Sequence, residues 1–253
     1  MIHVKDLSKV YDNGFKAVSN LSLHVKSGDI YGFLGPNGAG KTTTIRMLNG
    51  LIKPTGGEVT IEGTLVKQDE PSVKRKIGVL PESHGYYNWM TGYEYLTFFA
   101  ELYDVPKEIR TERVINVLEM VGMSEKKNIR IGQYSRGMRQ RIGIAKTIVH
   151  QPSLIFLDEP TLGLDPQGQK DIQKIILDLN QKQGVTVFIT SHLLKEIAEI
   201  CNRVAIVKKG RLLEEGEISQ LLHKYERKIQ SPDSSQPVTL EDVFFYVTKE
   251  GEQ

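Results

Sequence analysis

The chain has a single cysteine, Cys201, so it cannot form an internal disulfide, and a reducing compartment is the natural expectation. We expect that cysteine to be a small buried residue on the helix I-A-E-I-C. No apolar run approaches the roughly 20 residues that a membrane-spanning helix needs. The first residues, M-I-H-V-K-D, lack the apolar core of a signal peptide. We therefore expect a soluble chain, for which another polypeptide must supply any spanning helices.

A marked charge excess is also missing, because 33 basic and 31 acidic residues leave a formal net charge of +2. Nucleic-acid-binding proteins usually carry a basic face, so we expect no nucleic acid partner. Apolar residues make up 39% of the 253 positions, which is enough for a core in one large domain or two lobes. No internal repeat or low-complexity tract is evident.

The stretch from Asp29 to Asn49 contains the phosphate-binding pattern G-x-x-x-x-G-K-[ST]. The apolar run 30–34 before it is typical of a buried strand. After it, one apolar helical face is formed by Ile45, Leu48 and Ile52. The glycines are therefore predicted at a strand-to-helix turn, which is the context that the pattern requires. The alternative is a glycine turn with a structural role only.

Glycines in such a turn let successive backbone N–H groups point into one concavity, and the helix N-terminus adds partial positive charge. Phosphates fit there. Lys41 is predicted to sit on the β- and γ-phosphates, and the Thr42 hydroxyl to coordinate Mg²⁺. The predicted nucleotide-binding residues of this loop are Gly35, Pro36, Asn37, Gly38, Ala39, Gly40, Lys41, Thr42 and Thr43.

The rest of the chain predicts an α/β fold. Residues 1–28 contain alternating runs around the turn D-N-G, which favour antiparallel strands ahead of the nucleotide strand. Residues 83–150 show helical spacings, whereas buried strands and amphipathic helices alternate again from Gln151. We predict a P-loop NTPase core with a mainly parallel sheet, an N-terminal antiparallel β subdomain and an inserted all-helical subdomain. The predicted domains are 1–225, with the insert at about 83–150, and a linker with a short helical tail at 226–253.

Two adjacent carboxylates, Asp158 and Glu159, end the buried run L-I-F-L-D-E-P. Acids at such a place are unfavourable unless a cation compensates them. Asp158 is predicted to hold Mg²⁺, and Glu159 to orient and polarise the attacking water. The alternative is a pair of acids that caps the next helix.

Two further motifs complete the pattern. I-G-Q-Y-S-R-G-M-R-Q-R-I-G-I-A-K is a turn leading into a helix, with Ser135 and Gly137 at the helix mouth, and T-S-H at 190–192 follows a later strand. With Tyr11 and the phosphate loop, these motifs make the chain resemble an ATP-binding cassette (ABC) ATPase over nearly its whole length. More narrowly, the chain resembles the nucleotide-binding subunit of an ABC-2-type exporter. Signatures of the form Y-S-x-G-M-x-Q-R and a short V-F-type tail occur in that subgroup.

The resemblance implies further roles. Tyr11 is similar to the aromatic residue that stacks on the base, although a tyrosine closing a strand is more often a packing residue. His192 matches the switch histidine that contacts the γ-phosphate, and Leu164 and Asp165 match a loop that crosses to a partner subunit. Ser135 and Gly137 match the signature, which in this family faces ATP held by the other subunit. The plain alternative is a serine N-cap with an adjacent glycine.

The chain departs from the general family pattern at two places. Glu82 stands where many relatives have glutamine, and a metal and coupling role is retained for it. The signature carries Arg136 and Met138 in place of glycine and glutamine, and Arg136 is expected to face solvent or the partner. The aromatic segment with Tyr86, Tyr87 and Trp89 lies where the family receives a helix of the membrane subunit, with core packing as the alternative.

The resemblance implies an ATPase with ATP and Mg²⁺ as ligands. It would act as a homodimer or as a heterodimer with a related ATPase, bound to separate transmembrane permease subunits at the cytoplasmic face of the membrane. Export is the implied function. One alternative is a soluble ABC ATPase acting on ribosomes or DNA, which usually has tandem cassettes or a long coiled coil between phosphate loop and signature. Another is a nucleotide-sensing module with little turnover.

Overall fold

The computed structural model describes residues 1–68, 70–83, 85–229 and 237–250. The chain divides into two compact units. The first comprises Met1–Val73 and Thr186–Gln253, and the second comprises Lys74–Val185. Most of the predicted linker, residues 230–236, lies outside the described residues. No helix in the described part of the chain is long and apolar enough to cross a membrane.

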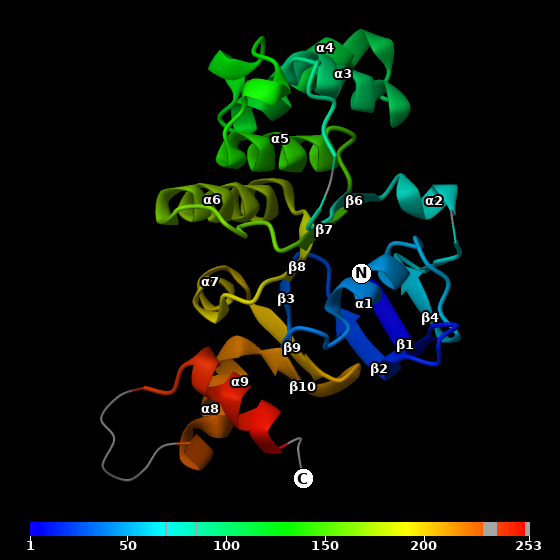
Figure 1. Ribbon diagram of the computed structural model, residues 1–253, viewed down its shortest axis with the longest axis vertical. Coiled ribbons are helices and arrows are strands. Elements are labelled where there is room, and N and C mark those ends of the chain that lie inside the picture. The colour runs from blue at the N-terminus through cyan, green and yellow to red at the C-terminus, as the bar shows by residue number, and fades with distance from the viewer. Residues whose placement is uncertain (69, 84, 230–236, 251–253) are drawn as a thin grey trace. The chain divides into compact units, whose positions relative to one another are not determined.

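An antiparallel sheet opens the first unit, with strand order β2-β1-β4-β5. Its strands are β1 (Ile2–Val10), β2 (Lys16–Val25), β4 (Gly56–Ile61) and β5 (Thr64–Leu65). Val4 of β1 lies opposite Leu23 of β2 and Val59 of β4, and all three side chains are buried. Figure 1 shows β1, β2 and β4 side by side, in blue to cyan. The predicted antiparallel strands are therefore confirmed.

Four further strands of the first unit carry the nucleotide loop. They are β3 (Ile30–Leu34), β8 (Thr186–Thr190), β9 (Arg203–Lys208) and β10 (Arg211–Glu217). β3 pairs in parallel with both β8 and β9, and β10 completes an antiparallel hairpin with β9. Every residue of β3 and β8 is buried, as their continuous apolar runs predict. Because parallel strands place their carboxyl ends at one edge, the segments after β3 and β8 are neighbours.

The helices of the first unit differ in part from the sequence prediction. They are α1 (Lys41–Leu48), α7 (Leu194–Ile200), α8 (Ile218–Ile229) and α9 (Leu240–Glu250), while the short α2 (Pro71–Lys74) runs to the start of the second unit. The predicted apolar face of α1 extends four positions past the helix end at Leu48, because Asn49 caps the helix and Gly50 has a positive φ of 72°. Ile52 therefore lies beyond the helix end.

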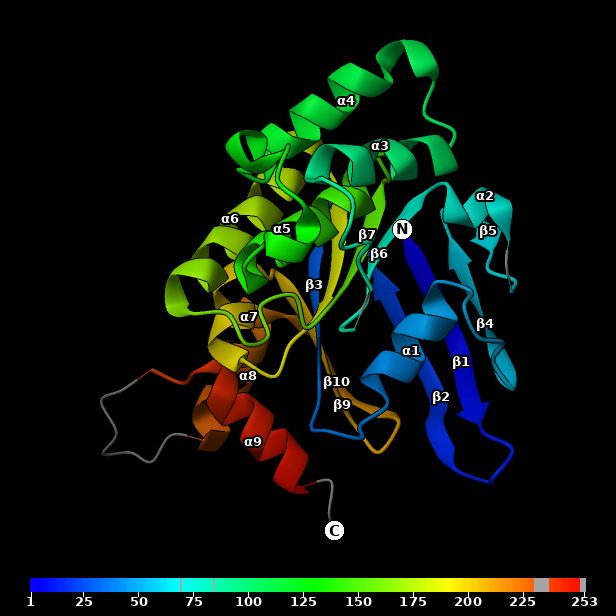
Figure 2. The ribbon, with the colours of Figure 1, turned by 45° about the horizontal axis from the view of Figure 1, so that its top comes forward.

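The C-terminal helix α9 is docked, as predicted. The Thr239 hydroxyl accepts a hydrogen bond from the Asp242 N–H, and an Asp242 carboxylate oxygen accepts from the Thr239 N–H, which completes the capping box. Val243 is fully buried. α8 and α9 lie side by side (Figures 1 and 2), and the rings of Tyr225 and Tyr246 meet between them at 5.6 Å.

The second unit combines a parallel strand pair with helices. β6 (Ile77–Leu80) pairs with β7 (Leu154–Asp158). The helices are α3 (Gly92–Leu102), α4 (Lys107–Met120), α5 (Arg136–Ile148) and α6 (Pro166–Gln183), with single 3₁₀ turns at Ser124–Lys126 and Ile131–Gln133. α3, α4 and α5 pack against one another (Figure 2). The inserted all-helical region is therefore confirmed, whereas its exact boundaries and the limits 1–225 and 226–253 stay predictions.

Gly78 sets how closely α5 approaches β6. A Cβ atom at this position would lie 2.1 Å from the backbone oxygen of Thr147. We expect Gly78→Ala to lower the free energy of unfolding by about 1–3 kcal/mol, because backbone must move to admit the methyl group. Urea unfolding measures the change. Gly85→Ala is the matched control, since no atom of the described residues beyond its chain neighbours lies within 4 Å of the corresponding Cβ, and equal losses for both variants would contradict this account.

Candidate functional site

The phosphate loop lies between β3 and α1, as predicted. Gly40 is the N-cap of α1 and has a φ of 98°, in the left-handed region that favours glycine. A Cβ atom at Gly40 would lie 2.5 Å from the Ala17 backbone oxygen, and one at Gly35 would lie 2.5 Å from that of Val207. Both motif glycines are therefore required by close packing of the loop against its own unit.

Lys41 lies over this loop. Its Nζ donates hydrogen bonds to the backbone oxygens of Gly35, at 2.8 Å, and Pro36, at 3.4 Å. The ammonium charge and the N-terminus of α1 thus lie at the same loop. Both favour an anion there.

Tyr11 lies beside the first turn of α1. Its hydroxyl is hydrogen-bonded to the Thr43 hydroxyl, at 3.2 Å, although 32 positions separate the two residues. The Lys9 ammonium lies 5.5 Å from the centre of the Tyr11 ring. The structure thus brings Tyr11 to the phosphate loop, and stacking of its ring on a base stays a prediction.

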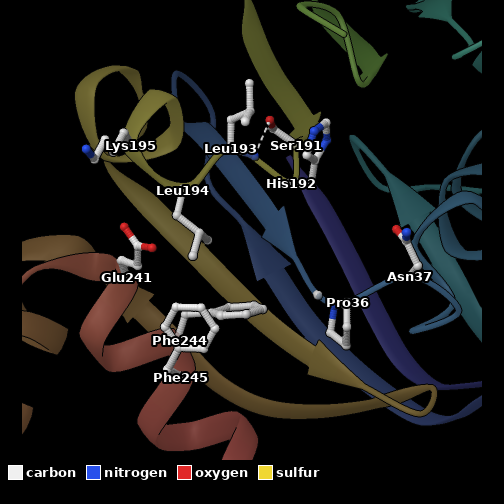
Figure 3. A pocket seen from close by; sticks show the side chains of 11 residues that line it. Pro36, Asn37, Ser191, His192, Leu193, Leu194, Lys195, Glu241, Phe244 and Phe245 are labelled. Carbon is white, nitrogen blue, oxygen red and sulfur yellow. Dashed lines mark hydrogen bonds between the residues drawn. The ribbon is translucent and has the colours of Figure 1, made fainter. Parts of the chain in front are cut away.

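His192 faces the phosphate loop across a cavity of about 510 Å³ within the first unit. Three segments line that cavity: the loop at 35–37, the segment 191–195 that follows β8, and α9. Figure 3 shows their side chains around one space, with Phe244 and Phe245 projecting from α9. The Ser191 hydroxyl accepts a hydrogen bond from the Leu193 N–H, at 3.0 Å, which shapes the turn that carries His192.

The C-terminal helix α9 lines the cavity beside His192, and the sequence did not indicate this position. Phe244 and Phe245 lie about 200 positions after the phosphate loop, and no local pattern relates the two segments. The adjacent phenylalanines of an amphipathic helix were the available signal, and they predict docking without saying against what.

In the second unit, Asp158 and Glu159 follow one another at the end of β7. Asp158 is 3% exposed, and Glu159 has a φ of 52°, which non-glycine residues adopt rarely. The next helix begins only at Pro166, and its N-cap is Asp165, whose Oδ1 accepts the Gly168 N–H at 2.9 Å. The alternative interpretation of the acid pair as a helix cap is therefore wrong.

Ser135 lies at the mouth of α5, as predicted, and is its N-cap, which is also what the plain alternative predicts. Its Oγ accepts a hydrogen bond from the Met138 N–H, at 3.3 Å. Apart from the helix's own backbone and the chain neighbours, no atom in the described part of the chain would lie within 4 Å of a Cβ built at Gly137, so the first turn of α5 is open on that side. This arrangement leaves room for a ligand at the helix mouth, while contact of Ser135 and Gly137 with a nucleotide stays a prediction.

The remaining candidates in the second unit differ in exposure. Glu82 follows β6 by two positions and is exposed. Tyr86 packs inward: its hydroxyl donates to the Arg139 backbone oxygen at 2.6 Å, and burial raises its pKa. Trp89 is 68% exposed and Tyr87 is 38% exposed, with their ring centres 5.1 Å apart. Only Tyr87 and Trp89 thus remain as candidates for a docking surface.

No group of three or more His, Cys, Asp or Glu among the described residues could hold a metal ion. Mg²⁺ in nucleotide sites is usually bound by one or two carboxylates together with phosphate oxygens and waters, rather than by a complete protein cage. The carboxylate of Asp158 and the hydroxyl of Thr42 are oxygen donors of the required kind.

Comparison with known proteins agrees with this geometry. The ABC transporter family profile matches residues 18–162. The bacitracin transport ATP-binding protein BcrA of Bacillus licheniformis is 41% identical over 247 residues, which is 97% of this chain and 79% of the relative. BcrA of Enterococcus faecalis is 40% identical, over 93% of this chain and 75% of the relative. A solved dimeric ATP-binding cassette in a post-hydrolysis state, with ADP and Pi bound, is 28% identical with a TM-score of 0.77, over 86% of this chain and 98% of that one.

Five features together define an ATP-binding cassette. They are a buried strand, a glycine loop, a lysine at a helix N-terminus, a strand that ends in a carboxylate and a signature helix capped by serine. The chain belongs to the ABC transporter family. It is an ATP-binding subunit of that family and an ATPase.

Proposed function

We propose that this subunit drives export through separate membrane subunits, and that two cassettes close around two ATP molecules in each cycle. The observation that carries the proposal is the 41% identity, over 97% of the chain, to a subunit named for bacitracin transport. The partner cassette is a second copy or a related ATPase. The Y-S-x-G-M-x-Q-R signature, typical of ABC-2-type exporters, supports export as the direction.

In the first unit, the backbone N–H groups of the loop 35–43 bind the phosphates, and Lys41 places its charge on the β- and γ-phosphates. On binding, its Nζ exchanges the backbone oxygens of Gly35 and Pro36 for phosphate oxygens. Tyr11 stacks on the base, and its hydrogen bond to Thr43 fixes the ring beside the loop. His192 contacts the γ-phosphate from the segment after β8.

The acid pair supplies the hydrolytic groups. Asp158, Thr42 and Glu82 would hold Mg²⁺, directly or through water, and the ion would supply positive charge to the phosphates. Glu159 accepts a hydrogen bond from the attacking water and orients it for in-line attack. Its left-handed backbone conformation is rare outside glycine, and such conformations cluster at functional sites.

The other copy completes the site. Ser135 caps α5, so the N-terminus of that helix presents backbone N–H groups and partial positive charge to a phosphate. A nucleotide held by one copy thereby stabilises the closed dimer, and loss of the γ-phosphate contacts loosens it. The solved post-hydrolysis relative, which is dimeric with ADP and Pi bound, supports this reading.

A membrane partner docks on the exposed aromatic pair Tyr87 and Trp89, which brings the chain to the cytoplasmic face of the membrane. Aromatic side chains of this exposure are good anchors for a partner helix. The test is to express the chain with the membrane proteins encoded beside it. We expect them to co-purify and to stimulate ATP hydrolysis several-fold.

The double variant Tyr87→Ala/Trp89→Ala is expected to lose the co-purifying membrane proteins while the isolated chain keeps its ATPase activity. The matched control is Ile115→Ala, an exposed apolar residue on α4 of the same unit, outside the ring contacts of Tyr87. Purification with ribosomes or DNA, and without any membrane protein, would contradict the proposed function and favour the non-transport alternative.

A further inference from the structure

The signature helix α5 begins with an arginine that contacts the loop after the acid pair. Arg136 Nη2 donates a hydrogen bond to the Leu162 backbone oxygen, at 2.7 Å. Gly163 has a φ of 69°, and a Cβ atom there would lie 2.3 Å from Cζ and 2.4 Å from both Nη atoms of Arg136. Since three atoms of the guanidinium are equally near, its flat face lies against Gly163. Only glycine leaves that space open.

Arginine is an unfavourable choice at this place for the helix alone. A cation in the first turn opposes the helix dipole by about 0.3–1 kcal/mol, and no acidic residue stands in the first turn of α5 to compensate it. The presence of Arg136 is therefore explained by its contact with Leu162 and Gly163 rather than by the stability of α5.

The contact joins two helix mouths within the second unit. One is the mouth of α5, which Ser135 caps, and the other is that of α6, where the loop from Leu162 ends at the N-cap Asp165. A second tie lies further along the same two helices, where the Arg141 guanidinium pairs with Asp171. The signature and the loop 162–165 are thus fastened at one end by Arg136 and along their helices by Arg141.

We propose that Arg136 is a positioning residue, which fastens the signature to the loop 162–165 so that both meet the second cassette as one surface. The inference rests on the proposed ATP-dependent dimer. Arginine suits this role because its planar fork can hydrogen-bond a carbonyl oxygen while its face packs on backbone, which the lysine ammonium cannot do. Arg136 is exposed, as the sequence led us to expect, whereas its contact with Leu162 and Gly163 was not predicted.

The test measures ATP-induced dimerisation of the full chain by light scattering, with hydrolysis blocked by Glu159→Gln. Arg136→Gly in that background should raise the ATP concentration for half-maximal dimerisation about three- to tenfold, because the signature and the loop 162–165 must then be ordered against each other on association. In the hydrolysing enzyme, KM should rise by a similar factor and kcat should stay within about twofold, because the chemical groups are untouched. Lys107→Gly, which removes a cation from the first position of α4 in the same unit, should change neither value.

Arg136→Lys separates charge from geometry, and it should resemble Arg136→Gly rather than the parent chain. Gly163→Ala should weaken dimerisation by displacing the guanidinium and by straining the left-handed backbone, and the first of these two effects should be lost when Arg136 is already glycine. Such non-additivity is the mark of two groups in contact. Independent, multiplicative effects, or full activity of Arg136→Lys, would overturn the inference.

Failure of the inference is distinguishable from failure of the proposed function. A parent Glu159→Gln chain that stays monomeric at saturating ATP would overturn the dimer and this inference with it. A chain that dimerises with ATP, and does so equally well with Arg136→Gly, would leave the proposed function standing and refute only the role of Arg136.

Discussion

Glu159→Gln is expected to abolish turnover and to trap the closed dimer. Glutamine keeps the size of the side chain, but its amide cannot accept the proton of the attacking water, and general-base catalysis typically contributes 10²–10⁴-fold. We therefore expect kcat to fall at least about a hundredfold. ATP binding should persist, because the phosphate loop of the first unit is unchanged. Phosphate release and size-exclusion chromatography with ATP measure the two effects.

Glu112→Gln on α4 is the matched control for that variant, since it makes the same chemical change at an exposed position of the same unit. It should hydrolyse ATP at the rate of the parent chain and show no stable dimer. A Glu159→Gln chain that is monomeric with ATP and keeps the parent turnover would refute both the catalytic role of Glu159 and the cycle of closure and release.

The sequence correctly predicts where each motif of the site lies in the secondary structure, because each motif stands where a strand or a helix begins or ends. The loop after β3 and the serine at the mouth of α5 occupy their predicted places, since a buried strand and an amphipathic helix leave distinct periods on either side. The carboxylate pair ends its strand for the same reason. What a motif does when it binds a nucleotide is a further step, and the roles of these residues stay predictions.

The sequence prediction of helix α1 was wrong where two local sequence patterns favour different structures. Ile52 continued the helical spacing of α1, yet Asn49 and Gly50 end the helix first, because a glycine with positive φ is the stronger signal. α8 was missed altogether, although its buried residues Ile218 and Tyr225 stand at helical spacing, seven positions apart.

Contacts between segments that are distant in the sequence could not be predicted from local residue periodicity. Tyr11 reaches Thr43, and α9 reaches the cavity beside His192, only because the strands between them fold into sheets. The contact of Arg136 with Leu162 and Gly163 is of the same kind. The sequence identified these residues as candidates or as departures, whereas their partners emerged from the tertiary structure.

Lys41→Ala is expected to remove most of the affinity for ATP. The variant loses a full charge from a loop whose remaining donors are neutral N–H groups, and hydrogen bonds to charged groups contribute about 1.5–3 kcal/mol each. With contacts to two phosphates, we expect Kd to rise about a hundredfold. Monomeric binding is the quantity at issue, so the measurement uses the isolated chain at low concentration.

Thermal unfolding with and without ATP gives the readout for Lys41→Ala. At an ATP concentration 100 times the parent Kd, binding stabilises the parent by about 2.7 kcal/mol, and a hundredfold weaker variant by only about 0.4 kcal/mol. The comparison uses the ATP-induced change rather than the melting temperature itself, because Lys41 also bonds Gly35 and Pro36 within the loop. Lys53→Ala, an exposed lysine of the same unit, should show the full parent shift, and the same shift in Lys41→Ala would refute the role of that lysine in holding phosphate.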